Sequence, residues 1–176
     1  MAEKLLTPEK PTEKRPARDG ANENVDRNRL IELLNEDLSR EYQAIIAYVV
    51  YSQVLKGPEY MKIASELEVH ATEELKHALT ISRQIDYLGG EPTVEPKPVK
   101  SSTVAKEMLQ FDLDNEVDTI REYRRRLRQC ESLGEYAVAE HIRNILVDEQ
   151  DHLIELATAL GIDLMLRNNV EQRSRV

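Results

Sequence analysis

Six residues of the sequence have the types and the spacing of a two-metal site. Two Glu-x-x-His motifs occur, and each lies 33 residues after another glutamate. The six residues are Glu41, Glu74, His77, Glu116, Glu149 and His152. Four glutamates and two histidines supplied by four helices form the ligand set of di-iron and di-manganese carboxylate sites. Oxygen-rich ligation with some imidazole suits iron or manganese, and the single cysteine, Cys130, excludes a site built from several thiolates.

Helix-breaking residues divide the chain into four long stretches. Gly57 and Pro58 are adjacent, a cluster of glycines and prolines falls at 89–98, and Gly134 and Gly161 stand alone. The stretches between these breaks are rich in good helix formers, so we expect four helices and no strands. The stretches are 26–56, 59–88, 99–133 and 135–160.

The six candidate ligands fall on the helix faces that should point into the core. Stepping by three and four residues, each helix shows a stripe that is apolar towards its ends and carries carboxylates or imidazoles in the middle. In each half of the chain, the midpoint of the two glutamates falls at the turn between the helices, so these glutamates should face each other. A tyrosine follows the first glutamate by seven residues in both halves, as Tyr48 and Tyr123. The chain is therefore predicted to be a duplicated hairpin.

The negative charge of four glutamates buried together must be neutralised. Desolvation and mutual repulsion would be very costly if all four were bare anions, so they must be protonated or neutralised by cations. Two histidines that can bind as neutral imidazoles favour metal ions. The alternative, that these are exposed residues whose motifs arise by chance, is disfavoured because both glutamate pairs are centred on turns.

The connections between the stretches predict the topology. The first two helices, and the last two, are joined by short loops, so each pair should be antiparallel neighbours. Roughly a dozen residues with three prolines separate the second and third helices, enough to run the length of the bundle. Two hairpins joined by one long crossover is the ferritin-like arrangement. We expect an all-α ferritin-like four-helix bundle at 26–165, a flexible extension at 1–25, and a short C-terminal tail at 166–176 that leaves room for a short fifth helix.

Composition narrows the environment and the partners. The chain has 176 residues and a formal net charge of −9, from 24 Lys+Arg against 33 Asp+Glu. Such an acidic surface disfavours nucleic acid and anionic membranes and is compatible with cations. The start of the sequence has no signal-type apolar region, and the longest apolar run, 44–51, is far below membrane-spanning length. We expect a soluble cytoplasmic protein without nucleic-acid or membrane partners.

Four segments resemble the metal-site segments of the bacterioferritins in order and spacing. These segments are SREYQAIIAY, ELKHA, FDLDNEVDTIREY and ILVDEQDHLIEL. The resemblance covers roughly residues 26–160, and it implies a terminal glutamate and histidine for each of two metal ions and two bridging glutamates. The resemblance implies that Glu41 and His77 are the terminal ligands of one metal ion, and Glu116 and His152 those of the other. Glu74 and Glu149 would bridge the two ions.

The resemblance also implies roles for residues around the metals. Tyr48 matches a tyrosine that the family keeps beside the metals, where it would supply an electron or a hydrogen bond. Asp112 and Asp148 match positions that orient the ligand histidines. Tyr123 matches no family tyrosine with such a role and is interpreted as an ordinary core side chain.

Two other features of the sequence have simple interpretations. His70 precedes Glu74 by one turn on the inner stripe, and we expect a hydrogen-bonded core histidine rather than the ligand of a third metal. The arginine-rich run at 124–128 is expected to be a solvated helix face with salt bridges.

Three departures from the bacterioferritins limit what the resemblance implies. Leu75 follows the first bridging glutamate, and the second helix has no counterpart of the family's haem-ligating methionine, so haem is not expected. The polar end RNNVEQRSRV stands where the family usually has a fuller fifth helix, so a 24-subunit and a 12-subunit shell are both open. The proline-rich start also differs from the family's usual start.

The resemblance implies a ferroxidase of an iron storage or detoxification protein. Such a protein binds two Fe(II) per subunit, oxidises them with O2 or H2O2, and stores Fe(III) in a homo-oligomeric shell. The alternative is a di-manganese or di-iron catalase or peroxidase without mineral storage, which keeps manganese as a second candidate metal. A DNA-protecting shell is disfavoured, because such shells usually place metal sites between subunits and lack the paired Glu-x-x-His motifs.

Overall fold

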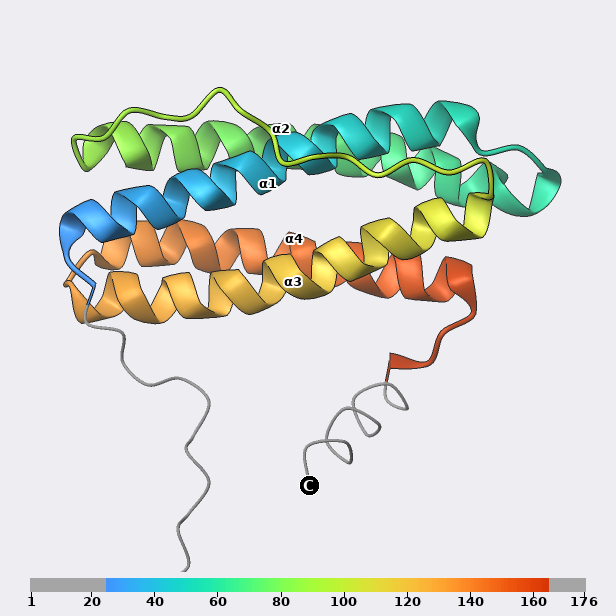
Figure 1. Ribbon diagram of the computed structural model, residues 1–176. Coiled ribbons are helices and arrows are strands. Elements are labelled where there is room, and N and C mark those ends of the chain that lie inside the picture. The colour runs from blue at the N-terminus through green and yellow to red at the C-terminus, as the bar shows by residue number, and fades with distance from the viewer. Residues whose placement is uncertain (1–24, 165–176) are drawn as a thin grey trace, which may run out of the picture.

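Four helices make up most of the structure, a computed structural model that describes residues 25–164 (Figure 1). The helices are α1 (Arg27–Val54), α2 (Met61–Tyr87), α3 (Ala105–Ser132) and α4 (Tyr136–Leu160), with a short 3-10 helix, η1 (Pro58–Tyr60), before α2. The described residues contain no strand. The predicted all-α class with four helices is confirmed.

The helices form two antiparallel hairpins joined by a long crossover. Helix α1 pairs with α2 and α3 pairs with α4, while α1 also packs on α3 and α2 on α4. Residues 88–104 run along the outside of the bundle from the end of α2 to the start of α3 (Figure 1). The backbone N–H of Lys97 donates to the Ser39 carbonyl at 3.0 Å, and the Gln43 side chain donates to the Pro98 carbonyl at 2.6 Å. The crossover is therefore fixed to α1.

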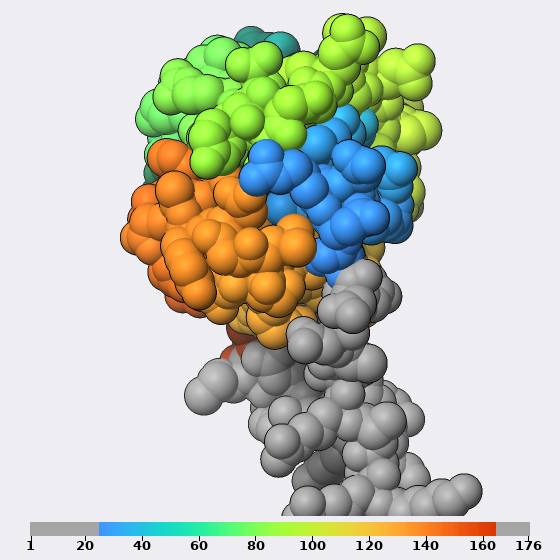
Figure 2. Space-filling model, turned by 90° about the vertical axis from the view of Figure 1, so that its left-hand side faces the viewer, coloured from blue at the N-terminus to red at the C-terminus, as the bar shows by residue number. Residues whose placement is uncertain are grey.

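The start of α1 and the turn between α3 and α4 lie side by side at one end of the bundle (Figure 2). Arg27 Nη2 lies 2.6 Å from the Glu135 carboxylate just before α4. The Asp26 side chain accepts a hydrogen bond from the Arg29 N–H at 2.8 Å and so caps α1. At the other end, Gly161 ends α4 with a left-handed backbone, φ 69°.

The third helix begins later than the sequence predicts, at Ala105. The serine- and threonine-rich segment before it offers side-chain partners to the backbone, which favours helix starts and turns over helix interiors. Ser102 donates to the Glu107 carboxylate in the first turn at 2.6 Å. The Tyr51 hydroxyl on α1 donates to the Lys100 carbonyl, so this part of the crossover stays docked on the bundle.

Two apolar clusters fill the bundle, one on either side of a polar middle. The first includes Leu34, Leu38, Ile81, Tyr123, Cys130 and Ile142. The second includes Ala47, Tyr51, Leu67, Leu109, Leu113 and Leu156. On α1, Glu41 lies between Leu38 of the first cluster and Ala47 of the second. The helices thus hold the predicted ligands at the level where the apolar packing is interrupted.

The predicted terminal segments lie largely beyond the described part of the chain. Of the extension at 1–25, only Val25 is described, and its side chain is buried. The tail at 166–176, with the room for a fifth helix, falls outside the described residues. Within residues 25–164, no helix combines the length and the apolar character that crossing a bilayer requires.

Candidate metal centre

The structure brings all six predicted ligands together in the middle of the bundle. Each is at most 4% exposed. Their ligand atoms form two groups of four residues, within each of which the atoms lie no more than 4.8 Å apart. The groups are Glu41, Glu74, His77 and Glu149, and Glu74, Glu116, Glu149 and His152. Glu74 and Glu149 belong to both groups, as two bridging carboxylates would.

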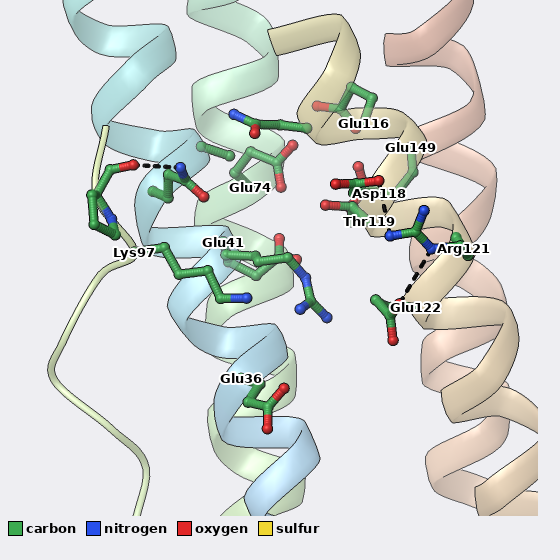
Figure 3. A pocket seen from close by; sticks show the side chains of 15 residues that line it. Glu36, Glu41, Glu74, Lys97, Glu116, Asp118, Thr119, Arg121, Glu122 and Glu149 are labelled. Atoms are coloured by element: carbon green, nitrogen blue, oxygen red, sulfur yellow. Dashed lines mark hydrogen bonds and ion pairs between the residues drawn. The ribbon is translucent and has the colours of Figure 1, made fainter. Parts of the chain in front are cut away.

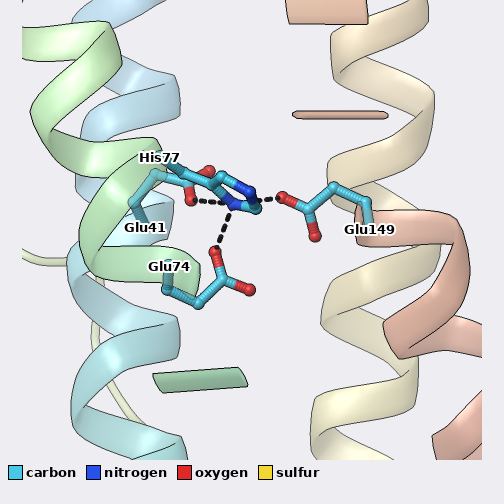
Figure 4. Close-up of side chains that lie close together, drawn as sticks. All are labelled: Glu41, Glu74, His77 and Glu149. Carbon is cyan, nitrogen blue, oxygen red and sulfur yellow. Dashed lines mark hydrogen bonds and ion pairs between the residues drawn. The ribbon is translucent and has the colours of Figure 1, made fainter. Parts of the chain in front are cut away.

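Both histidines turn Nδ1 towards the shared glutamates. In the first group, His77 Nδ1 lies 3.0 Å from Glu74 Oε2, 3.4 Å from Glu41 Oε2 and 3.5 Å from Glu149 Oε1 (Figure 4). In the second group, His152 Nδ1 lies 3.1 Å from Glu74 Oε1 and 3.8 Å from Glu149 Oε2. The donor atoms therefore surround two neighbouring positions rather than one.

Buried donor atoms without hydrogen bonds show that these residues fit metal ions. Five of the six residues each have one side-chain atom that is fully buried and has no hydrogen-bond partner. They are Glu41 Oε2, Glu74 Oε1, Glu116 Oε2, Glu149 Oε1 and His152 Nδ1. A buried polar atom is costly to leave unpaired, and metal ions would satisfy carboxylate oxygens and imidazole nitrogens of this kind.

The outward-facing nitrogen of each histidine has a carboxylate partner. His77 Nε2 lies 3.1 Å from Asp148 Oδ2, as the resemblance implies. His152 Nε2 lies 3.0 Å from Glu73 Oε2, and no hydrogen bond joins it to Asp112, one of the two residues for which the resemblance implies this role. An Nε2–H that donates to a carboxylate leaves the Nδ1 lone pair free for a metal. The internal repeat could have identified Glu73 from the sequence. Glu73 and Asp148 are 75 residues apart, and each immediately precedes the glutamate of a Glu-x-x-His motif.

A tyrosine donates a hydrogen bond to each of the two glutamates that belong to only one ligand group. The Tyr48 hydroxyl on α1 donates to Glu116 Oε1, and the Tyr123 hydroxyl on α3 donates to Glu41 Oε1. Burial, together with the adjacent glutamate in each case, raises both tyrosine pKa values well above the ordinary value. Tyr123 is therefore more than an ordinary core side chain. Its position seven residues after Glu116, matching Tyr48, was the sequence signal.

Without metal, burial favours the protonated form of two carboxylates of this centre, Glu74 and Glu116. Burial, reinforced by the charge of Glu41, raises the pKa of Glu74 to about 8. Burial and Glu149 raise the pKa of Glu116 well above its ordinary value. For Glu41, burial acts in the same direction, but the close side chains of His77 and Glu74 outweigh it and lower the pKa.

The histidines also hold protons in the absence of metal. Burial alone would lower both pKa values, but the surrounding carboxylates outweigh it. The pKa of His77 is raised, chiefly by Glu149 and Glu41, and that of His152 is raised to about 12, chiefly by Glu149 and Glu74. The cluster thus carries protons that bound cations would replace.

A cavity of about 480 Å³ connects the carboxylates with the surface between α1 and α3 (Figure 3). Its deepest lining residues are Glu41, Glu74, Glu116 and Glu149, and its outer lining includes Glu36, Arg40, Lys97, Asp118, Arg121 and Glu122. The crossover forms one wall through Lys97 and Pro98. The cavity therefore reaches from the surface to the carboxylate donor atoms.

A buried ion pair lies beside the Glu41 half of the centre. Arg126 is 1% exposed, and its Nε lies 2.6 Å from Asp37 Oδ2. The interpretation of residues 124–128 as a solvated face is therefore wrong for Arg126, which lies one turn after Tyr123 and shares its inward face. The 75-residue repeat relates Asp37 to Asp112 and Arg126 to Tyr51.

Unlike Asp37, Asp112 forms no ion pair with an arginine or lysine among the described residues. It is 2% exposed, its Oδ2 has no hydrogen-bond partner, and burial and the charge of Glu116 raise its pKa well above the ordinary value. The two halves of the centre therefore have the same ligands but different surroundings.

His70 lies next to the centre without joining either ligand group. Its Nε2 is 2.7 Å from Glu155 Oε2, and its ring stacks on that of His152 at a centroid distance of 4.0 Å. Burial, followed by the charge of His152, lowers its pKa to about 4. His70 is thus a neutral, hydrogen-bonded core histidine in this structure.

Comparisons with known proteins agree with this architecture. The family model described as "Ferritin-like domain" matches residues 31–165. The bacterioferritin of Desulfovibrio desulfuricans is 30% identical over 126 residues, which cover 71% of this chain and 70% of that protein. The bacterioferritin of Brucella melitensis is 28% identical over 135 residues, covering 76% and 84%.

Solved structures show the same likeness. A ferritin-like, diiron-carboxylate protein of Bacillus anthracis superposes with a TM-score of 0.73 and 34% identity, over 76% of this chain and 96% of that one. Rhodobacter capsulatus bacterioferritin, solved with a metal-free dinuclear site and haem iron, gives a TM-score of 0.70 and 27% identity, over 78% and 86%. This chain belongs to the ferritin-like family, as a bacterioferritin-like member of it.

Proposed function

We propose that this chain is a ferroxidase of an iron storage or detoxification protein. Its substrate would be Fe(II), bound as two ions per chain, and its oxidant O2 or H2O2. The observation that carries the proposal is the pair of buried ligand groups that share Glu74 and Glu149. Similarity to bacterioferritins and to a diiron-carboxylate structure supports iron as the metal.

The six ligands would divide between two iron ions. Glu41 with His77 would hold one ion and Glu116 with His152 the other, while Glu74 and Glu149 would bridge them. Two Fe(II) on shared carboxylates can pass two electrons to one oxidant molecule. With two protons, these electrons convert O2 to H2O2, or H2O2 to two waters. Tyr48, hydrogen-bonded to Glu116, would hold that ligand in place beside the metals.

An aerobic Fe(II) titration of metal-free protein tests the proposal. Ferric absorbance and the iron retained after gel filtration would be measured together. Uptake far beyond two irons per chain, in a large assembly, is expected for storage. Saturation near two would contradict storage and favour the alternative, a di-manganese or di-iron catalase or peroxidase. Peroxide turnover by manganese- and iron-loaded protein would then identify that activity.

Variants of the bridging glutamates link this activity to the site. Glu74→Ala and Glu149→Ala should each abolish rapid Fe(II) oxidation, because each removes a ligand common to both positions. Glu68→Ala, an exposed glutamate on α2, is the matched control and should oxidise Fe(II) normally. Unaltered oxidation in both bridging variants would overturn the assignment.

We also propose that the chain forms a homo-oligomeric shell of 24 or 12 subunits. The outward faces of α1 and α2 carry apolar side chains that are 42–58% exposed. They are Ile46, Val49, Val50, Val54, Val69, Leu75 and Leu79. Apolar stripes of this extent on a single chain support contact with other subunits. Light scattering coupled to gel filtration would give the subunit number.

Haem is not part of the proposal, because the residue after Glu74 does not fit it. Leu75 is half-exposed on α2 and carries no atom that binds iron. Absence of a Soret band after addition of haemin would agree, and a stoichiometric band would not. The cytoplasmic location and the lack of a nucleic-acid partner stay predictions, which cell fractionation and a gel-shift assay at low salt would test.

A further inference from the structure

A lysine without an acidic partner projects into the cavity that leads to the metal centre. Lys97 comes from the crossover and lines the same cavity as the four ligand glutamates (Figure 3). Two other cations line this cavity, and both are paired: Arg40 with Asp37, and Arg121 with Asp118 at 2.9 Å. Among the described residues, no ion pair includes Lys97.

The backbone around Lys97 holds this charge in place. The Lys97 N–H donates to the Ser39 carbonyl at 3.0 Å, and the next carbonyl, of Pro98, accepts from Gln43 at 2.6 Å. Earlier in the crossover, the Asn35 side chain donates to the Glu91 carbonyl at 3.0 Å. Because this segment is tied to α1 on both sides of the lysine, the backbone of Lys97 stays at the cavity wall, and the side chain lines the cavity from there.

The surroundings of Lys97 do not neutralise its charge. Burial and the nearby Arg40 lower its pKa, while Glu36 and Asp37 act in the opposite direction. Lysine titrates near pH 10.4 in water, far above neutral pH, and the nearby carboxylates favour the ammonium form. A divalent cation that moves through the cavity to Glu41 and Glu74 therefore passes a fixed positive charge.

We propose that Lys97 sets the rate at which divalent metal ions reach the centre, by electrostatic repulsion within the cavity. An ammonium has no lone pair to offer a metal, so Lys97 changes the rate of uptake and leaves the number of sites unchanged. Repulsion of this kind is screened by salt, with a Debye length of about 10 Å at 0.1 M. The inference deepens the proposed function and rests on the metal centre proposed above.

Anaerobic stopped-flow binding of Co(II), followed by its visible absorption, tests the proposal on the full chain. Lys97→Gln should accelerate Co(II) uptake by about three- to tenfold at low ionic strength. The acceleration should shrink as salt is added, and Lys97→Arg should bind at the wild-type rate.

Lys100→Gln is the matched control. It removes the same charge three residues farther along the crossover, where the Lys100 ammonium lies 5.2 Å from the centre of the Phe111 ring and outside the cavity. We expect wild-type kinetics from this variant. Equal rates for Lys97→Gln and wild type, a slower rate, or equal acceleration in Lys100→Gln would overturn the role of Lys97.

The stoichiometry separates the two proposals. Two Co(II) per chain in wild type and in Lys97→Gln, with different rates, would support both the metal centre and the role of Lys97. Two per chain with identical rates would retain the centre and overturn the role of Lys97. Fewer than two per chain in wild type would overturn the proposed centre itself.

Discussion

The carboxylate of Glu73 on α2 lies 3.0 Å from Nε2 of His152 on α4. Its counterpart on α4, Asp148, lies 3.1 Å from Nε2 of His77 on α2. The acidic residue that precedes one Glu-x-x-His motif thus orients the histidine of the other motif. The contacts cross between the hairpins, so they join α2 to α4 and fix both imidazole rings before any metal binds.

Removal of either orienting carboxylate should weaken metal binding. In Glu73→Gln or Asp148→Asn, the histidine loses its charged acceptor, and metal affinity should fall by about 10- to 100-fold. Competition titration with Co(II) and a chromophoric chelator would measure this. Glu68→Gln, an exposed change on α2, is the control, and an equal loss in that variant would show a general charge effect instead.

Tyr123 should contribute to the stability of the metal-free protein. In Tyr123→Phe, buried Glu41 loses a hydrogen-bond donor, which should lower the free energy of unfolding by about 1–3 kcal/mol. Urea unfolding in the presence of a chelator measures this difference. Tyr42→Phe, at a half-buried tyrosine on α1, is the control. Equal losses in the two variants would mean that the hydroxyl–glutamate contact contributes little.

The metal-free protein should lose stability as pH rises from about 5 to 8. The pKa of Glu74 is about 8 in the folded protein against an ordinary 4.5, so over this range the folded state binds more protons than the unfolded state. Stability must then fall with increasing pH. His152, with a pKa of about 12 against 6.5, acts in the same direction above pH 6.5.

Thermal unfolding from pH 5 to 8 with a chelator would show this slope. Glu74→Gln should flatten it, because an amide does not titrate. Metal-loaded protein should not show the loss, since bound metal replaces the protons, and metal affinity itself should rise with pH. A midpoint that climbs between pH 5 and 8 in metal-free wild type would contradict the prediction.

The buried ion pair can be distinguished from the exposed ones in the same arginine run. Arg126→Met removes the buried cation and leaves Arg40 as the remaining partner of Asp37, so the free energy of unfolding should fall by up to about 3–5 kcal/mol. Arg125, whose side chain is 55% exposed, pairs with Glu122 at 3.1 Å. Arg125→Met should cost at most about 1 kcal/mol. Similar losses in both variants would show that the Arg126 pair is worth no more than a surface pair.

The helices and the six ligands could be predicted because both follow from spacing along the chain. Breaks at glycine and proline mark the ends of helices, and the 3.6-residue period places Glu41 and Glu74 on inward faces. The repeat of 75 residues then brings the second set to the same level. Glu73 carried the same signal but lies just beside the inward stripe, where spacing alone does not distinguish a partner from a solvated residue.

Features that depend on contacts between distant segments could not be predicted in this way. Arg126 lies in a run of arginines, and only the position of Asp37 on another helix shows that it is buried. Lys97 lies in a crossover whose path is set by individual hydrogen bonds to α1 and not by a periodic pattern. The late start of α3 likewise depends on where Ser102 finds its partner.

The pairing of Asp37 with Arg126 has a consequence for how such a centre can diverge. In the other half of the repeat, Asp112 is equivalent to Asp37 and Tyr51 is equivalent to Arg126. Asp112 therefore pairs with no cation among the described residues. A dimer of identical hairpins would carry the guanidinium on both sides of the centre or on neither. Fusion of two hairpins into one polypeptide removes that constraint, so substitution in one half can make the two metal positions chemically unequal while the ligands stay the same.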